Sequence, residues 1–298
     1  GANPMPFPVP SVRGCRVHAR QRVRTGPTNQ AAVVTMDHVL ATSDGKGYGL
    51  VRNLQTCIYG RVRHGVELER IPSEEVSGGL FGAVRQMTTD PVLWRATERQ
   101  VAVKCIERTK YEQHVARHRG QLNEDPIKEV AVMEFIAQEG GAPYVLPLLA
   151  TYADEQTVYV ILPLCPHGDL FGVVERDGGL QEAKAATYMG QVVHGLERLH
   201  AMGLAHHDMS LENLLVDAER RAVIIDFGMA VRVAPGEDVF EQGFSTLLYM
   251  APEMFWNWHM ESESAAATPG SVAYGSAVDV WAVGLVAYQL LVGTLPFG

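Results

Sequence analysis

Cysteine is scarce in this sequence. Its four cysteines are spread over 298 residues, and no two of them form a CxxC pair. This excludes the disulfide framework of a small secreted domain and leaves no zinc-binding motif. We therefore expect reduced thiols and a cytoplasmic or another reducing compartment.

A surplus of positive charge is also missing. The chain carries 25 Lys and Arg against 34 Asp and Glu, a formal net charge of −9. Such an acidic chain is poorly suited to neutralising phosphates, so no nucleic-acid partner is expected.

The N-terminus is the exception to this acidity. Residues 1–60 hold seven basic and two acidic side chains, a net charge of +5, which leaves −14 on residues 61–298. We treat residues 1–60 as a basic N-terminal extension. Its arginine-rich arm, residues 11–24, is expected to contact an acidic surface, a lipid headgroup or the acidic remainder of its own chain; the alternative is a solvated tail.

Long hydrophobic runs are nearly absent as well. The first ten residues lack the charged and apolar regions of a secretory signal peptide. Residues 280–297 are uncharged over 18 positions, close to the length that spans a membrane. Gln289 and the glycine and proline near the end of this run favour a buried core helix instead. We therefore expect no transmembrane segment.

What the sequence does contain is an ordered change of pattern. Residues 61–105 alternate between apolar and polar side chains as strands do. Residues 126–138 place apolar groups at helical spacing, with Pro126 suited to the first turn. Residues 158–164 form a short apolar run that is typical of a buried strand.

Beyond residue 164 the spacing of apolar residues becomes mainly helical. It predicts helices over residues 181–201 and 276–293. The chain is therefore expected to belong to the α+β class, with a β-rich lobe over about residues 61–164 and a larger helical lobe over about residues 165–298.

Five short motifs occur in one order along the chain. They are a glycine-rich turn, a strand that ends in lysine, a polar loop, an Asp-Phe-Gly segment and an Ala-Pro-Glu segment, at residues 77–84, 101–104, 206–213, 224–228 and 251–253. This set resembles the signatures of the eukaryotic protein kinase family, namely G-x-G-x-x-G-x-V, V-A-I-K, H-R-D-x-x-x-x-N, D-F-G and A-P-E.

The resemblance covers residues 65–298 and implies a two-lobed protein kinase fold over residues 61–298. Because the family continues with several more helices, the C-lobe is expected to be incomplete after residue 298. The implied activity is transfer of the γ-phosphoryl group of ATP, with Mg²⁺, to a serine or threonine hydroxyl of a protein substrate. A pseudokinase, or a nucleotide-binding scaffold with weak or no catalysis, is the alternative.

Phosphoryl transfer needs several negative charges held still, and the motifs offer groups that can hold them. The resemblance implies that Lys104 neutralises the α- and β-phosphates and needs a carboxylate to position it. The helix at residues 126–138 offers Glu129 and Glu134. Glu129 is preferred, because apolar residues then follow it at the next three and four positions, on the packing face.

Three polar residues of the loop segments complete the implied catalytic set. Asp208 is expected to orient the substrate hydroxyl and to accept its proton. Asp226 and the amide oxygen of Asn213 are expected to bind Mg²⁺, since both offer the oxygen ligands that a hard cation prefers.

The resemblance also implies a nucleotide site in which apolar residues enclose the adenine and the Cys165 N–H donates to it. Its residues come from the glycine-rich turn, two strands, the segment joining the lobes and the loop regions: Val76, Ser77, Gly78, Gly79, Gly82, Val84, Ala102, Lys104, Leu162, Pro163, Cys165, Asp169, Leu215 and Asp226.

The sequence departs from the family at several positions. Ser77 replaces the first glycine of the turn, and His207 replaces the arginine of H-R-D. Ser210 stands where most serine/threonine kinases have a lysine, so one cation near the γ-phosphate is missing and slow chemistry is plausible. Thr246 matches the threonine that supports the catalytic aspartate in serine/threonine kinases.

A preference for basic residues near the acceptor is also expected. Asp169 and Glu212 match acidic positions that face substrate arginines in basophilic members of the family. Gln289 stands at a third such position, so the preference is expected to be moderate.

Overall fold

The computed structural model describes residues 6–26, 32–71, 94–117, 125–233, 247–255 and 275–297. Its contacts divide the chain into two compact units. We call one the barrel unit, which comprises residues 11–120 and 148–164, and the other the helical unit, which comprises residues 1–10, 121–147 and 165–298.

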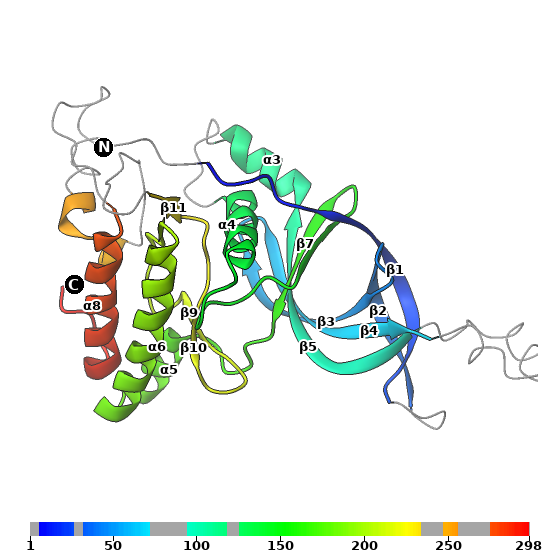
Figure 1. Ribbon diagram of the computed structural model, residues 1–298. Coiled ribbons are helices and arrows are strands. Elements are labelled where there is room, and N and C mark those ends of the chain that lie inside the picture. Colours follow the sequence, from blue (N-terminus) through cyan, green and yellow to red (C-terminus); the bar gives the residue numbers. More distant parts are fainter. Residues whose placement is uncertain are drawn as a thin grey trace, which may run out of the picture. The chain divides into compact units, whose positions relative to one another are not determined.

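The barrel unit is a closed β-barrel with the strand order β1-β2-β3-β4-β5-β7-β6 (Figure 1). Its elements are β1 (Arg13–Arg24), β2 (Val33–Thr42), β3 (Gly47–Cys57), β4 (Gly60–Arg70), β5 (Trp94–Glu107), α3 (Arg108–Arg117), β6 (Ala150–Ala153) and β7 (Thr157–Pro163). Neighbouring strands are antiparallel, except that β1 pairs in parallel with β6 and, at one end, with β5.

Side chains of β5 alternate between the barrel core and the opposite face of the sheet. Val101, Val103 and Cys105 are buried, whereas Ala102 and Lys104 between them are half-buried on the other face. The buried set belongs to a core cluster drawn from five strands: Leu40, Tyr48, Leu50, Val101, Val103, Cys105, Tyr152, Tyr159 and Ile161.

The N-terminal extension is part of this barrel. Strands β1, β2 and β3, all before residue 60, pair with one another and continue through β4 to β5. The arginine-rich arm forms β1, which pairs with β6 at Arg13 and with β5 at Val23. A solvated tail is therefore the wrong interpretation of the arm: its backbone hydrogen bonds are satisfied by the rest of the sheet.

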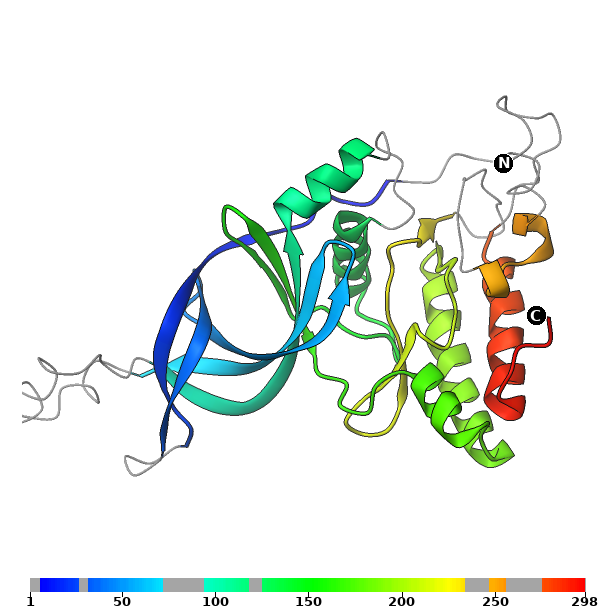
Figure 2. The ribbon, with the colours of Figure 1, turned by 180° about the vertical axis from the view of Figure 1, so that it is seen from behind.

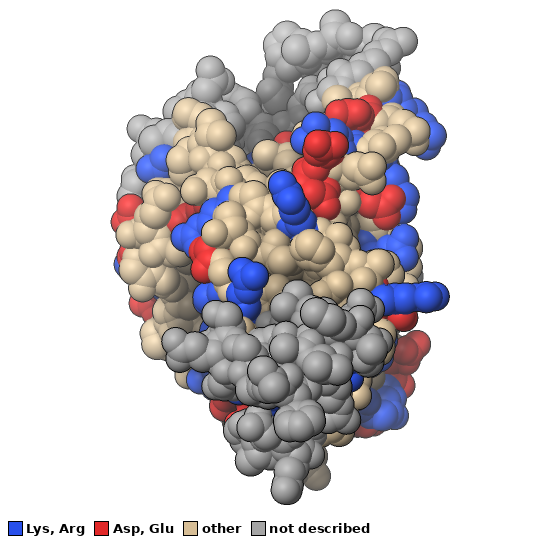
Figure 3. All heavy atoms as spheres, turned by 90° about the vertical axis from the view of Figure 1, so that its right-hand side faces the viewer, with Lys and Arg blue, Asp and Glu red and all other residues tan. Residues whose placement is uncertain are grey.

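Charges of both signs share the outer face of the barrel (Figure 3). Lysine and arginine side chains are spread over this face with acidic side chains among them. Arg13 pairs with Asp44 at 2.9 Å and Arg95 with Glu69 at 3.2 Å. Exposed pairs of this kind add little stability, but they neutralise part of the positive charge that the sequence concentrates here.

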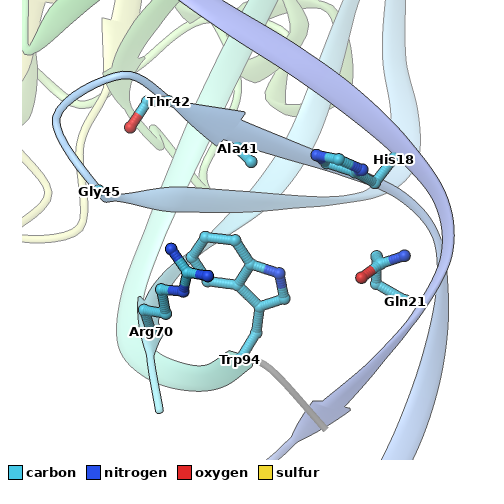
Figure 4. Close-up of a pocket in the computed structure, with 7 residues that line it drawn as sticks. All are labelled: His18, Gln21, Ala41, Thr42, Gly45, Arg70 and Trp94. Atoms are coloured by element: carbon cyan, nitrogen blue, oxygen red, sulfur yellow. The ribbon is translucent and has the colours of Figure 1, made fainter. Parts of the chain in front are cut away.

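A pocket of about 190 Å³ lies in the barrel unit (Figure 4). It is lined by His18, Gln21, Ala41, Thr42, Gly45, Arg70 and Trp94. The indole of Trp94 packs so closely on Gly47 that a Cβ there would lie 2.7 Å from the ring. None of the residues that the sequence analysis assigns to a site lines this pocket.

In its described residues the helical unit contains helices and two separate two-stranded sheets (Figures 1 and 2). They are α4 (Pro126–Gln138), α5 (Leu170–Asp177), α6 (Glu182–Ala201), β8 (Leu204–Ala205), β9 (Leu214–Val216), β10 (Ala222–Ile224), β11 (Val231–Arg232), the 3₁₀ turn η1 (Leu247–Tyr249) and α8 (Ala277–Val292). The sheet-rich N-terminal region and helical C-terminal part confirm the predicted α+β class.

Helices α4, α6 and α8 lie where the apolar spacing predicts them, whereas α3 and α5 were not predicted. Helix α4 begins at Pro126, and the Asp125 side chain caps it by accepting the Ile127 N–H at 2.9 Å. The contacts of α4 group it with the helical unit, although the sequence analysis places residues 126–138 in the β-rich lobe.

Helix α8 differs from its prediction in one respect. The prediction is a buried core helix, but only one face is buried, by Val278, Asp279 and Val286 among others. On the opposite face Val280 is 63% exposed and Leu291 is 47% exposed. In the described residues its helical neighbours, α5 and α6, cover one side only. No described helix is both long and apolar enough to cross a membrane.

All four cysteines fall within the described ranges and are free thiols. Burial raises the pKa of the Cys105 thiol to about 11 and that of Cys165 to about 12. Both are therefore protonated, unreactive thiols near neutral pH.

Candidate active site

Two small two-stranded sheets bring the polar loop and the Asp-Phe-Gly segment together. Strand β8, which leads into the loop, pairs with β11, and β9, which follows the loop, pairs with β10. The Ile225 N–H donates to the Asn213 carbonyl at 3.0 Å. This bond places Asp226 beside the end of the polar loop.

Asp208 and Asn213 are joined directly. Nδ2 of Asn213 donates to the carboxylate of Asp208 and to its backbone carbonyl, both at 2.8 Å. The two bonds fix the orientation of the amide, so the carboxylate of Asp208 is held by a neutral donor and Oδ1 of Asn213 stays an acceptor.

Asp226 has a left-handed backbone, with φ of 64°. This conformation is uncommon for a residue other than glycine, and aspartate tolerates it better than most. Its Oδ1 accepts the Gly228 N–H at 3.2 Å, which bends the chain immediately after the carboxylate. The following residue, Phe227, is 1% exposed and anchors the segment in the core.

The donor set formed by Asn213 and Asp226 fits a magnesium ion. Both offer oxygen, and the amide of Asn213 is turned by its bonds to Asp208. In the described residues no group of three or more His, Cys, Asp or Glu could hold a metal. Two protein oxygens suit Mg²⁺ bound together with nucleotide phosphates, because this ion takes few protein ligands in such sites.

The buried carboxylate of Asp279 in α8 anchors the start of the polar loop. The N–H groups of His206 and His207 donate to its two carboxylate oxygens at 2.8 Å each, and His200 Nε2 lies 2.8 Å from Oδ2. Burial alone raises the pKa of Asp279, but the hydrogen bond from His200 and the neighbouring histidines lower it, and the net shift is downward. Asp279 is thus a buried, ionised carboxylate, and both of its oxygens accept hydrogen bonds.

A second link runs through the ring of His206. Its Nδ1 accepts the Asp208 N–H at 3.2 Å, so Nε2 carries the proton and donates to the Ile225 carbonyl at 2.9 Å. The ring also packs against Phe227, with centroids 5.1 Å apart. One side chain therefore ties the residue before Asp226 to the backbone of Asp208.

Sequence reasoning did not assign Asp279 and His206 to the site. The available signal for Asp279 was an acidic residue directly before an uncharged apolar run. A buried acid at such a position needs hydrogen-bond donors from elsewhere in the fold. For His206 the signal was its place as the first residue of the polar-loop motif, residues 206–213.

His207 is buried, with 2% of its surface exposed, and has a left-handed φ of 65°. Burial lowers its pKa from 6.5 to about 4; the nearby Asp279 opposes this shift, whereas Lys128 and His206 add to it. The imidazole is therefore neutral near pH 7.

This buried imidazole makes stability depend on pH. Between pH 6.5 and about 4 the unfolded chain binds a proton that the folded chain excludes. The free energy of unfolding should therefore fall as pH falls through this window, by up to about 1.4 kcal/mol per pH unit from this group. Urea unfolding across the window measures it.

The variant His207→Asn isolates the effect. Asparagine does not titrate and accepts a left-handed backbone. Its unfolding free energy should depend less steeply on pH than that of the wild type between pH 6.5 and 4. Parallel curves for the two proteins would contradict the assignment.

In α4 the two candidate carboxylates differ in burial. Glu129 is 7% exposed, whereas Glu134 is half-buried. A buried carboxylate requires a partner, so burial favours Glu129 as the one that positions a cation. Lys104 belongs to the barrel unit and Glu129 to the helical unit, and their pairing remains a prediction.

Three predicted nucleotide contacts of the barrel unit share one face of the sheet. Ala102 lies directly opposite Leu162 in the β5–β7 ladder, and Lys104 is the next residue on that face. Pro163 pairs with Val101 at the end of the same ladder.

The predicted contacts in the helical unit also cluster. Asp169 and Leu215 form an isolated antiparallel bridge. Asp169 caps α5, and its Oδ1 accepts the Gly172 N–H at 2.7 Å. Cys165 lies at the start of the segment that leads to it. The remaining predicted contacts, which are Val76, Ser77, Gly78, Gly79, Gly82 and Val84, lie outside the described residues.

The residues expected to meet the substrate are close in the helical unit. The Tyr249 hydroxyl donates to Gln289 Oε1 and lies 3.5 Å from Glu212 Oε2. The first turn of α5 is joined to this region by the Phe171 N–H, which donates to the Leu211 carbonyl at 3.3 Å. Glu212 itself is exposed.

Comparison with known proteins points in one direction. Residues 73–298 match the family model described as "Protein kinase domain". The chain is 28% identical to mouse hormonally up-regulated neu tumor-associated kinase, over 76% of this chain and 28% of that protein. It is 30% identical to serine/threonine-protein kinase PKH3 of Eremothecium gossypii, over 75% of this chain and 28% of that protein. It is 29% identical to calcium-dependent protein kinase 17 of Arabidopsis thaliana, over 92% of this chain and 46% of that protein. The chain thus spans less than half the length of these relatives.

Proposed function

The chain belongs to the protein kinase family, and from that premise we propose that it transfers the γ-phosphoryl group of ATP to serine or threonine hydroxyls of a protein. The observation that carries the proposal is the joined set of Asp208, Asn213 and Asp226. Hydrogen bonds at 2.8 Å and 3.0 Å link the loops that hold these residues, so their spacing does not depend on a bound ligand.

In this proposal Asp208 accepts the proton of the attacking hydroxyl. The neutral amide of Asn213 donates a hydrogen bond to one carboxylate oxygen of Asp208 without protonating it. The loop that bears Asp208 is held by the buried carboxylate of Asp279. A base held in one orientation lowers the entropic cost of reaching the transition state.

Asn213 and Asp226 would hold Mg²⁺, which neutralises charge on the phosphates when it is bound. Hydrogen bonds keep the two residues in position for this role: the Ile225 N–H donates to the Asn213 carbonyl, and the Gly228 N–H donates to one carboxylate oxygen of Asp226. Lys104, positioned by Glu129, would add a positive charge on the α- and β-phosphates.

The remaining assigned residues would bind the nucleotide. Ala102, Leu162 and Leu215 offer apolar surface to the adenine, and the Cys165 N–H is the proposed donor to its ring. Pro163 has no N–H, so it can contribute only its carbonyl. Asp169 still has Oδ2 available for the ribose, although its Oδ1 caps α5.

Serine or threonine as the acceptor is supported by the names of relatives such as serine/threonine-protein kinase PKH3. Thr246, which matches a threonine typical of that class, supports it further, although it lies outside the described residues. The proposed kinase domain covers residues 61–298, with residues 1–60 as an extension.

A phosphotransfer assay tests the proposal. The purified chain, Mg²⁺ and radiolabelled ATP are combined with a peptide library in which each peptide carries one Ser, Thr or Tyr. Label is expected on serine and threonine peptides, and Asp208→Asn is expected to remove it. No transfer by the wild type, with nucleotide still bound, would instead identify a scaffold.

The same library tests substrate preference. We propose that basic residues N-terminal to the acceptor are favoured, because Glu212 is exposed beside Tyr249 and Gln289. An exposed ion pair contributes about 0.5–1 kcal/mol, so arginine should raise kcat/KM about two- to fivefold over alanine at one position.

The variant Glu212→Gln should reduce that ratio to about one. Glu175→Gln, on the exposed surface of α5, is the matched control and should leave the ratio unchanged. A library profile in which acidic peptides are the best substrates would refute the proposed preference.

A further inference from the structure

The first described residues of the chain pack against the helical unit. Residues 6–10, which we call the N-terminal strap, are grouped with this unit, although the barrel begins directly after them. Figures 1 and 2 show this blue start of the chain passing next to α4. Phe7 is half-buried there, whereas Val9 is 92% exposed.

The strap contacts the side chain of Phe135 in α4. The Phe7 ring meets the Phe135 ring edge-on, with centroids 6.3 Å apart and planes at 69°. Arg232 of β11 places its guanidinium carbon 4.4 Å from the centroid of the same ring. Nη1 of Arg232 also donates to the Pro6 carbonyl at 3.4 Å. The buried ring of Phe135, which is 7% exposed, is thus in contact with both Phe7 and Arg232.

Both kinds of ring contact are favourable. An edge-to-face aromatic pair and a cation over an aromatic face each add to the free energy gained by burial. The strap is also stiff, because Pro6 fixes its own φ and Pro8 restricts Phe7 to extended conformations. Docking Phe7 therefore costs little conformational entropy.

The two residues that contact the strap, Phe135 and Arg232, come from segments that carry the site. Phe135 lies six residues after Glu129 in the same helix, and Arg232 lies six residues after Asp226. Arg232 is also paired with Leu204, four residues before Asp208. A contact that fixes Phe135 against Arg232 therefore fixes α4 against β11 and its partner β8. In the sequence, β8 precedes Asp208 and β11 follows Asp226.

Resting on the proposed kinase function, we propose that Phe7, Phe135 and Arg232 are positioning residues that hold Glu129 in a fixed place relative to Asp226 and Asp208. The N-terminal strap is then part of the active arrangement of the helical unit. Losing it should loosen α4 and β11 and slow the chemical step, without weakening the binding of the peptide substrate.

Amide hydrogen exchange and kinetics of the full chain test the proposal. Phe7→Ala should speed exchange in α4 and β11 about tenfold, while exchange in α6 and α8 stays unchanged. It should lower kcat about five- to tenfold at an unchanged KM for peptide. Phe7→Tyr, which keeps the ring, should behave like the wild type, and so should the control Val9→Ala.

Two results would overturn the proposal. One is equal exchange in Phe7→Ala and Val9→Ala. The other is faster exchange throughout the helical unit, which would indicate general destabilisation. The exchange measurement does not require enzymatic activity. If the wild type showed no phosphotransfer, the proposed function would be refuted, but the exchange data would still show whether the strap holds α4 and β11.

A double-variant comparison separates a shared contact from two independent ones. Arg232→Met removes the cation and keeps most of the apolar stem. Since Phe7 and Arg232 act through the same ring, the effect of Phe7→Ala on exchange of α4 should be smaller in the Arg232→Met background than in the wild type. Fully additive effects would count against the proposal.

Discussion

Replacement of Asp226 by asparagine is expected to lower kcat/KM for phosphotransfer by at least about a thousandfold. The amide keeps an oxygen for the Gly228 N–H and tolerates the left-handed backbone at this position, so the local fold should persist. What it loses is the negative charge that would face Mg²⁺. The magnesium concentration needed for nucleotide binding should rise in parallel.

The measurements are kcat/KM with a peptide substrate and a magnesium titration of nucleotide binding. Asp177→Asn, an exposed acid at the end of α5, is the matched control and should change neither quantity. Melting temperatures of both variants should stay close to that of the wild type. Activity of Asp226→Asn above a few per cent would reject the role assigned to Asp226.

Replacement of Asp279 by alanine is expected to damage both stability and catalysis. The side chain is fully buried and accepts hydrogen bonds from the His206 and His207 N–H groups and from His200. Alanine leaves these donors buried without an acceptor, which should lower the free energy of unfolding by about 3–5 kcal/mol. Because the loop of Asp208 loses its anchor, kcat should also fall about a hundredfold.

Urea unfolding and steady-state kinetics measure the two effects. The adjacent variant Val280→Ala is the control, since Val280 is 63% exposed and should change stability by less than about 0.5 kcal/mol. An Asp279→Ala protein within about 1 kcal/mol of the wild type would show that the loop does not depend on this anchor.

Local signals predicted much of the helical unit. Apolar spacing and Pro126 indicated α4, and the structure begins the helix at that proline. The order of the motifs predicted that Asp208, Asn213 and Asp226 act together, and hydrogen bonds join the loops that bear them. These features depend on short stretches of sequence, where propensity and spacing carry most of the information.

Long-range pairing could not be predicted in the same way. Residues 11–24 stand out in the sequence only by their arginines, which indicate neither a strand nor that Val23 lies beside Trp94. The contact of Asp279 with His206 likewise joins residues 73 positions apart. Neither a periodicity nor a motif records which distant segment supplies the partner.

The barrel has a consequence for how this chain can be divided. The match to the kinase family begins at residue 73, but β1, β2, β3 and β4 all lie before that point. Removing them would strip β5 of its β4 neighbour and β6 of its β1 neighbour, exposing long open edges of a kind that templates aggregation. A chain cut at the start of the family match would therefore lack the strands that close the barrel, so the limits of the family match are not the limits of the folded barrel unit.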